Sequence, residues 1–370
     1  MVRVVFEFIE IYIRVFVILI VLLLFLLYYF NPKKIFLYDI VFIIAGYLFS
    51  LIFPRDYAFI SKIILFAIYI TLFYQLHFID FYNVNFRLIL TLFLEFFMYI
   101  FVILPILIIF LRRIDISILL LFILMLYESH LHSSNFKYNT SRSKHKLRIN
   151  NAVDEYEIKS FLIGFTFLLI FEFSKFILEN NSNVEFSKSI ILSLNQGLVA
   201  LFFGIILALL VEKLYSKTRN IRKLVIGIMF SFILLILFSK LLHLIPSLAL
   251  IGFGIPLVQI SKLKNLSYAI TVNLKDAFRP IIFFFLGFIF EFNSLKFILL
   301  SFILYFLVGV FSIFSDFVFG MNNFKFNHFF VDYDFYYVLF SVYLITVHHN
   351  LAMLLLFIFL LSKLFNEKLF

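Results

Sequence analysis

Cysteine and tryptophan are both absent from this chain of 370 residues, and charged side chains make up only 14% of it. The lack of cysteine excludes disulfide bonds and thiolate chemistry. The scarcity of charge excludes a disordered chain, because disordered segments combine few apolar residues with many charges. It also argues against a soluble globule, in which about 25% of the residues are usually charged.

Apolar residues are abundant instead, at 64% of the chain, and 59 of them are phenylalanine. A soluble fold of this length could not remove so much apolar surface from water. Since a membrane-spanning helix needs about 20 mostly apolar residues, the sequence predicts an all-α polytopic membrane protein with roughly 11–13 transmembrane helices. The net charge of +10 fits basic cytoplasmic loops, so we expect a lipid bilayer and no nucleic acid as a partner.

Apolar runs bounded by charges or turn residues mark the expected spans. Three apolar runs are short, at 114–127, 243–260 and 280–292. The last apolar run, 336–365, is interrupted at His348-His349-Asn350. Run 114–127 is a half-span, a re-entrant piece or a span shortened by polar residues. Helices interrupted by glycine and proline are where transporters expose backbone groups to line a site, so 243–260 and 279–292 favour a transporter over a passive anchor. The longer runs are 11–30, 35–53, 57–79, 88–111, 160–178, 189–211, 224–242 and 297–314.

One polar stretch, 129–159, separates a first half, about 1–128, from a second half, 160–370. We treat residues 1–370 as a single transmembrane transporter domain. Lysine and arginine gather in alternate connections, which we therefore expect on the cytoplasmic side of the membrane. The basic connections are 137–159, 213–223 and 262–275.

Three glutamates lie in or beside apolar runs: Glu95, Glu172 and Glu291. A charge at the centre of a bilayer costs at least about 2.5–3.5 kcal/mol, so carboxylates at that depth tend to be functional. Glu172 has Lys175 as a helical neighbour that would neutralise it, and Glu291 is close to an expected membrane interface. We treat all three as possible additional intramembrane carboxylates.

Several segments of the second half share a pattern of glycine, proline and phenylalanine. They are the helix with Gly197 and Gly204, the segment 243–257 with its Gly-rich end, and Phe278, Pro280, Phe283–Phe285 and Gly287. This pattern resembles the monovalent cation:proton antiporters of the sodium/proton exchanger family. The first half is similar to that family only in layout, and His348-His349 stand where the family usually has a pair such as Arg-Gly.

The resemblance implies an ion and proton site on a carboxylate pair at the start of a core helix, where Asp154 and Glu155 match. A carboxylate in a poorly solvated cavity favours its protonated form, so a proton and a cation with oxygen ligands would compete for it. Arg279 matches the residue that compensates charge in the family. The resemblance therefore implies exchange of Na⁺ or K⁺ for protons by alternating access, with inverted repeats, broken crossing helices and a homodimer.

Two other functions stay open at this point. Acidic loop residues would suit an integral membrane glycosyl or lipid-group transferase, and the chain could also be a non-transporting membrane subunit descended from an antiporter. These acidic residues are Asp56, Asp80, Asp316, Asp332 and Asp334. The sequence has no phosphate-binding Gly-rich loop and no ligand set with metal spacing. We therefore expect a transporter and not an enzyme, without a cofactor or a metal beyond the transported cation, in the cytoplasmic membrane of a prokaryote.

Overall fold

The computed structural model describes most of the chain, and the residues that it describes form helices and connections with no strand among them. These residues are 24, 35–77, 86–111, 114–130, 161–170, 172, 186–215, 221–259, 263–292, 295–318 and 335–368. Apart from residue 24, the expected span 11–30 lies outside them, and so does nearly all of the polar stretch 129–159.

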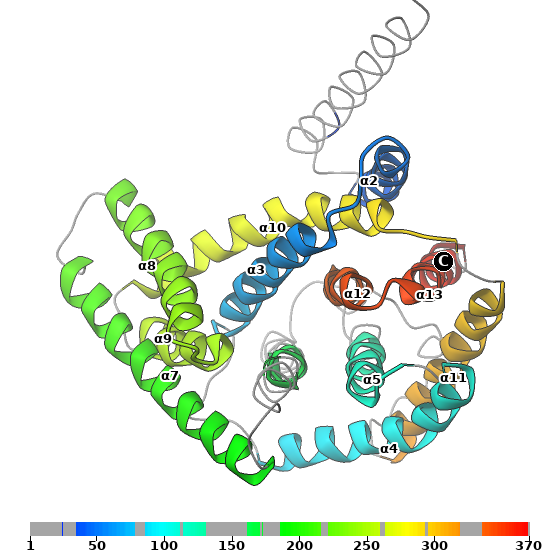
Figure 1. The fold of residues 1–370 in the computed structure, drawn as a ribbon, viewed down its shortest axis with the longest axis horizontal. Coiled ribbons are helices and arrows are strands. Elements are labelled where there is room, and N and C mark those ends of the chain that lie inside the picture. The colour runs from blue at the N-terminus through cyan, green and yellow to red at the C-terminus, as the bar shows by residue number, and fades with distance from the viewer. Residues whose placement is uncertain are drawn as a thin grey trace, which may run out of the picture. The chain divides into compact units, whose positions relative to one another are not determined.

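Apolar runs become helices, because a helix satisfies the hydrogen bonds of its own backbone in a membrane. The helices are α2 (Ile35–Ser50), α3 (Tyr57–Gln75), α4 (Phe86–Phe110), α5 (Ile116–His130), α7 (Phe186–Tyr215), α8 (Ile221–Leu241), α9 (Pro246–Gln259), α10 (Lys264–Phe288), α11 (Lys296–Val318), α12 (Phe335–Val347) and α13 (Ala352–Lys368) (Figure 1). Residues 161–170 and 172 are helical too. The described segments long and apolar enough to cross a membrane are Tyr57–Gln75, Leu194–Tyr215 and Arg222–Leu241. The predicted all-α polytopic membrane architecture is confirmed.

Two compact units make up the chain, and each combines segments from both halves of the sequence. Unit 1 comprises Met1–Ala67, Asp276–Ile303 and Tyr333–Lys368, and unit 2 is built mainly from Ile68–Lys275 and Leu304–Asp332. Helices α3, α10 and α11 contribute residues to both units. Each unit is described below by itself.

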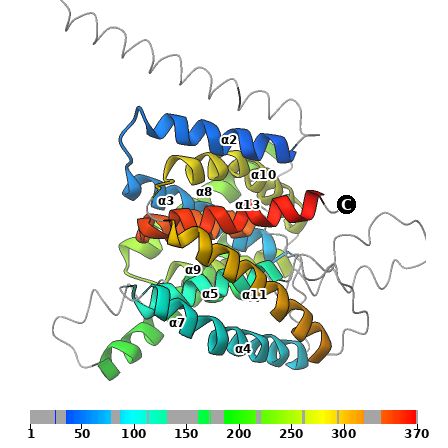
Figure 2. The same ribbon diagram turned by 90° about the vertical axis from the view of Figure 1, so that its right-hand side faces the viewer.

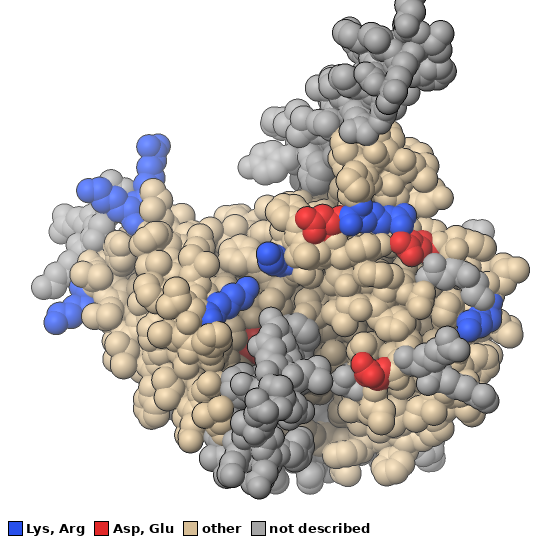
Figure 3. Space-filling model, in the orientation of Figure 1, with Lys and Arg blue, Asp and Glu red and all other residues tan. Residues whose placement is uncertain are grey.

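Large apolar side chains remain exposed on the described helices. On α7, Leu198, Phe202 and Ile206 recur at helical spacing and are each more than half exposed, at 58%, 61% and 58%. Lysines, arginines and acids are few on the face drawn in Figure 3. An apolar exposed surface of this kind suits the acyl chains of a bilayer, in which apolar side chains are solvated as well as in a core.

Helix α10 corrects the sequence prediction. We expected a basic connection at 262–275 and a short span from Pro280, but one helix runs from Lys264 to Phe288. Ser267 and Thr271 are buried one turn apart on this helix, and the Thr271 hydroxyl donates to the Ser267 carbonyl at 3.0 Å. The stretch also contains Lys264, Asn273 and Lys275, which lower its hydropathy without ending the helix. Hydropathy alone therefore missed the first half of α10.

The segment 243–260 is also less broken than we expected. Helix α9 begins at Pro246, a favourable residue for the first helical position, and continues through Gly252 and Pro256 to Gln259. Its glycines allow close helix packing and do not interrupt the helix.

The interruption expected at His348-His349-Asn350 is confirmed. Helix α12 ends at Val347, and His348 is extended, with φ −141° and ψ 91°. A single 3-10 turn, His349–Leu351, then leads into α13. The His348 N–H donates to the Leu344 carbonyl at 2.8 Å at the end of α12, and the Leu351 N–H donates to the His348 carbonyl at 3.1 Å, so the backbone stays hydrogen-bonded on both sides of the break.

Glycines bring α7 and α9 into close contact within unit 2. A Cβ atom at Gly204 would overlap the carbonyl oxygen of Ala249, and one at Gly252 would overlap the carbonyl oxygen of Leu201. Each glycine therefore lies against the backbone of the other helix, as small residues do where membrane helices cross. The crossing holds α9, whose first residues take part in the candidate site.

The variant Gly204→Ala is expected to destabilise unit 2, because overpacking a well-packed contact costs about 1–3 kcal/mol. The melting temperature of the purified protein in detergent measures this effect. Gly197→Ala on the same helix is the matched control, since its Cβ would meet the ends of two flexible side chains and no backbone atom, at 2.7 Å from Leu248 Cδ1 and 3.6 Å from Ile245 Cδ1. Equal destabilisation by both variants would contradict the close crossing.

Candidate functional site

Glu172 is a buried carboxylate in unit 2, with 9% of the residue exposed. The Tyr69 hydroxyl of α3 donates to its Oε1 at 2.6 Å. The Ser247 hydroxyl of α9 donates to Oε2 at 2.6 Å, and the Ser247 backbone N–H donates to the same oxygen at 3.1 Å. Both carboxylate oxygens therefore accept hydrogen bonds, which offsets part of the cost of burying a charge.

Ser247 can donate its backbone N–H because it is the second residue of α9, directly after Pro246. The first N–H groups of a helix have no partner inside the helix, and the helix dipole places partial positive charge there. Lys240 of α8 adds Coulombic attraction to Glu172. Lys175, the neighbour named in the sequence analysis, lies outside the described residues. The beginning of α9 thus stabilises the Glu172 carboxylate together with Tyr69 and Lys240.

The chemistry available at Glu172 follows from its partners. A hydroxyl group both donates and accepts hydrogen bonds, so Tyr69 and Ser247 can donate to the ionised carboxylate or turn oxygen lone pairs toward a bound cation. The carboxyl group can also take up a proton. Within the part of the chain that the structure describes, no three His, Cys, Asp or Glu side chains gather into a metal site. The arrangement suits one exchangeable positive charge.

Arg279 pairs with Asp39, a residue that the sequence analysis did not single out. The Arg279 Nη2 atom lies 2.7 Å from Asp39 Oδ2, and Nε donates to Oδ1 at 3.3 Å. The Asp39 side chain is 3% exposed and that of Arg279 is 25% exposed. The signal for Asp39 in the sequence is one acid inside the apolar run 35–53. Arg279 was expected to compensate the charge of Asp154 and Glu155, but its charge already has this described partner.

The ion pair joins two helices of unit 1 that lie side by side, α2 and the second half of α10 (Figure 2). A Cβ atom at Gly46 would overlap the carbonyl oxygen of Phe284, and one at Gly287 would overlap that of Ile43. Since glycines from both helices lie at the contact, the two backbones approach closely. Arg279 and Asp39 therefore form part of a tight α2–α10 contact.

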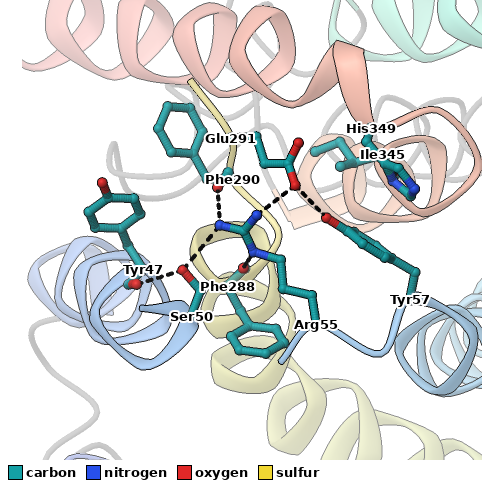
Figure 4. A network of polar contacts seen from close by, with 9 residues as sticks. All are labelled: Tyr47, Ser50, Arg55, Tyr57, Phe288, Phe290, Glu291, Ile345 and His349. Atoms are coloured by element: carbon teal, nitrogen blue, oxygen red, sulfur yellow. Dashed lines mark hydrogen bonds and ion pairs between the residues drawn. The ribbon is translucent and has the colours of Figure 1, made fainter. Parts of the chain in front are cut away.

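Glu291 lies just after α10 and pairs with Arg55 of the α2–α3 connection (Figure 4). The Arg55 Nη1 atom is 2.6 Å from Glu291 Oε1, and the Tyr57 hydroxyl donates to the same oxygen at 2.8 Å. Arg55 also donates to the backbone carbonyls of Phe288 and Phe290, both at 3.0 Å. A cation at the C-terminal end of a helix satisfies carbonyls that have no partner inside the helix. Glu291 thus belongs to a cap on α10, which we call the Arg55 cluster (Arg55, Tyr57 and Glu291).

Three other residues from the sequence analysis have no described side chain. Glu95 lies on α4, but its side chain is outside the described part of the structure, and Asp154 and Glu155 lie outside it altogether. Of the intramembrane carboxylates that we predicted, Glu172 is therefore the one whose surroundings are described as buried and fully hydrogen-bonded.

The fold and this site define an integral membrane protein of helices with a buried carboxylate and a broken helix. A solved structure shares the fold: the sodium proton antiporter MjNhaP1 from Methanocaldococcus jannaschii matches with a TM-score of 0.55 and 15% sequence identity. The match covers 96% of this chain and 99% of that one. That neighbour is a transporter and not an enzyme, and the antiporter-like fold implied by the sequence resemblance is confirmed. No family model matches the sequence, and a comparison with curated proteins found no match.

Proposed function

We propose that this protein is a secondary active transporter that exchanges a monovalent cation, Na⁺ or K⁺, for protons by alternating access. The observation that carries the proposal is Glu172, a buried carboxylate whose hydrogen-bond partners are hydroxyls and a helix N-terminus. The antiporter-like fold supports the same class of reaction.

Competition between a proton and a cation follows from the burial of Glu172. An ionised carboxylate away from water is costly, and either a proton or a cation removes its net charge. The two ligands would therefore exclude each other, and that exclusion is sufficient for exchange if the site opens to one side of the membrane at a time. Oxygen atoms from Tyr69 and Ser247 would add two ligands to those that the carboxylate supplies to a cation.

The sequence resemblance supports a second location for the ion site, at Asp154 and Glu155. We keep this pair as an alternative within the same function, with Arg279 as its proposed compensating residue. Homodimer formation and a location in the cytoplasmic membrane of a prokaryote are also part of the proposal, and they rest on the sequence analysis alone.

The test is proton flux in membrane vesicles that carry the protein and a pH-sensitive dye. Addition of Na⁺ or K⁺ is expected to dissipate an imposed pH gradient. Asp154→Asn and Glu155→Gln are expected to retain this flux if Glu172 is the carrier. If Asp154→Asn and Glu155→Gln are inactive while Glu172→Gln is active, the ion site is at Asp154 and Glu155 and not at Glu172. No flux with any monovalent cation would contradict the proposal and favour a transferase or a non-transporting subunit.

A second readout does not depend on transport. A ligand that binds only the folded state raises the free energy of unfolding, by about 2.7 kcal/mol at 100 times its Kd. We therefore expect Na⁺ or K⁺ to raise the melting temperature of the wild-type protein in detergent, and to leave that of Glu172→Gln unchanged. An equal rise in both proteins would place the bound cation elsewhere.

A further inference from the structure

A groove in unit 2 has walls that are almost entirely carbon. It lies between α4, α5 and the helix at 161–170, and its volume is about 450 Å³ with its open side included. Phe93 and Phe96 of α4 and Leu124 and Tyr127 of α5 form two of its walls. A concave site with apolar walls is typical of the places where proteins bind apolar ligands.

The groove has a buried floor and an exposed rim. Leu124, Tyr127 and Ile163 are each at most 5% exposed, whereas Phe93 is 52% exposed. The rings of Phe96 and Tyr127 pack against each other, with centroids 5.8 Å apart and planes inclined by 45°. Since the protein itself packs the floor, the groove keeps its shape before a ligand enters.

The third wall, from the helix at 161–170, adds carbon rather than polar contacts. Leu162 and Ile163 are aliphatic, and the Thr166 hydroxyl donates to the Leu162 carbonyl of its own helix at 2.6 Å. A polar ligand would lose its hydrogen bonds to water here and gain few in return, which is costly. The groove therefore selects an apolar ligand.

The rim of the groove continues into an apolar surface of α4. Phe97 and Phe101 follow Phe93 at intervals of four residues, so the three side chains share one face of the helix. Phe97 and Phe101 are 53% and 76% exposed. In a membrane protein such a face contacts the acyl chains of the bilayer. An acyl chain is therefore the apolar ligand that reaches the groove.

The groove lies near the ends of two of its helices. Tyr127 is close to His130, the last residue of α5, and Leu162 is close to the beginning of the helix at 161–170. At a rise of 1.5 Å per residue, Tyr127 is about 5 Å along the axis from the end of α5. A lipid with its acyl chain in the groove therefore has its headgroup close to the level of these helix ends.

The sequence that joins these helix ends is basic. The connection 131–160 follows His130 and precedes Phe161, so it begins and ends beside the groove. Its lysines and arginines outnumber its acids, and a segment of this kind attracts anionic lipids. The basic residues are Lys137, Arg142, Lys144, Lys146, Arg148 and Lys159, and the acids are Asp154, Glu155 and Glu157.

We propose that the groove between α4, α5 and the helix at 161–170 binds one acyl chain of an anionic phospholipid. The apolar walls bind the chain, and the charge of the connection favours the headgroup. Three helices contact this chain, whereas a lipid further along α4 contacts an exposed face. The lipid in the groove is therefore held more tightly than the lipids around the protein. Its binding does not depend on the proposed exchange of ions.

The first experiment uses the absence of tryptophan from the chain. Phe93→Trp places a fluorescent reporter on the rim of the groove, and Phe101→Trp is the matched control on the same face, about 12 Å further along α4. Each full-length variant is reconstituted into vesicles of a zwitterionic phospholipid with increasing fractions of an anionic phospholipid that has brominated acyl chains, because bromine quenches tryptophan at short range. Half-maximal quenching of Phe93→Trp is expected at a mole fraction roughly fivefold lower than that of Phe101→Trp.

Equal quenching curves at the two positions would overturn the proposal, because the groove would then hold lipid no more tightly than the open surface does. A Phe93→Trp variant that brominated lipid does not quench would also overturn it, since protein would then fill the groove.

The headgroup is tested by a brominated zwitterionic lipid and by salt. The difference between Phe93→Trp and Phe101→Trp is expected to shrink with the zwitterionic lipid. It is also expected to shrink when the salt concentration rises from about 0.01 M to about 1 M, which shortens the screening length from about 30 Å to about 3 Å. A difference that stays the same in both tests would overturn the assignment of an anionic headgroup.

The last experiment closes the groove. In the Phe93→Trp background, Thr166→Phe adds a ring to the wall and is expected to raise the half-maximal fraction to that of Phe101→Trp. Thr166→Val is the matched control, because it keeps the size of threonine and leaves the groove open. Leu162→Phe narrows the same groove and replaces Thr166→Phe if that variant does not elute as a monodisperse protein. An unchanged half-maximal fraction in a folded groove-filling variant would overturn the proposal.

Discussion

Glu172→Gln is expected to abolish cation-dependent proton flux, to the level of vesicles that lack the protein. Glutamine has the size of glutamate, and its carbonyl oxygen still accepts a hydrogen bond from Tyr69 or Ser247. It cannot bind a proton or supply a negative charge to a cation at ordinary pH. The variant therefore removes the proposed competition while preserving the shape of the site.

The fold of this variant is expected to survive, because removing an ionised group from a buried position lowers a desolvation cost. A monodisperse elution profile and a melting temperature at or above that of the wild type would establish this. Loss of flux in a folded variant would then result from the loss of the Glu172 carboxylate and not from misfolding. Wild-type flux in Glu172→Gln would exclude Glu172 as the carrier.

Tyr69→Phe and Ser247→Ala are expected to have smaller effects than Glu172→Gln. Each removes one hydroxyl at 2.6 Å from a carboxylate oxygen. Each variant removes one of the oxygen atoms that we propose as ligands of the cation, so each is expected to weaken the apparent cation affinity by about tenfold, or about 1.4 kcal/mol of binding free energy. Unchanged affinity in both variants would show that the hydroxyls do not bind the cation.

Local sequence patterns predicted most of the helices, because a helix that spans a membrane needs a long apolar run and such a run is visible in the sequence. The expected spans 35–53 and 224–242 became Ile35–Ser50 and Ile221–Leu241. The first half of α10 escaped prediction, since Asn265, Asn273 and Lys275 lower its hydropathy average. The break at His348 was predictable because three polar residues interrupt a strongly apolar run.

The site was less predictable than the fold, because its contacts join distant parts of the chain. Glu172 could be singled out as a carboxylate in an apolar run. Its partners Tyr69 and Ser247, however, are 103 and 75 residues away in the sequence. The same limit applies to Arg279, whose partner Asp39 is 240 residues away. Pairings of this kind depend on the tertiary fold, and spacing along the chain carries no signal for them.

Arg279→Gln is expected to cause the second large effect, a loss of folded protein. Removing one partner of a buried ion pair costs about 3–5 kcal/mol, because the other charge stays buried without compensation. Asp39 would be that charge, with its side chain only 3% exposed. Since folded proteins are stable by about 5–15 kcal/mol, the yield of monodisperse protein and its melting temperature should both drop clearly. Asp39→Asn should be milder, because the Arg279 side chain is longer and 25% exposed.

The double variant Asp39→Asn/Arg279→Gln tests whether the loss of stability in Arg279→Gln comes from the unpaired charge of Asp39. Two neutral amides of similar size leave no charge uncompensated, so the double variant is expected to be more stable than Arg279→Gln alone. A double variant as unstable as Arg279→Gln would mean that Arg279 stabilises the fold through other contacts, such as the ring of Phe283 at 5.5 Å. A third result would support the sequence prediction that Arg279 compensates charge at the ion site. If Arg279→Gln stays folded and loses exchange while Asp39→Asn keeps it, Arg279 compensates the charge of the ion site.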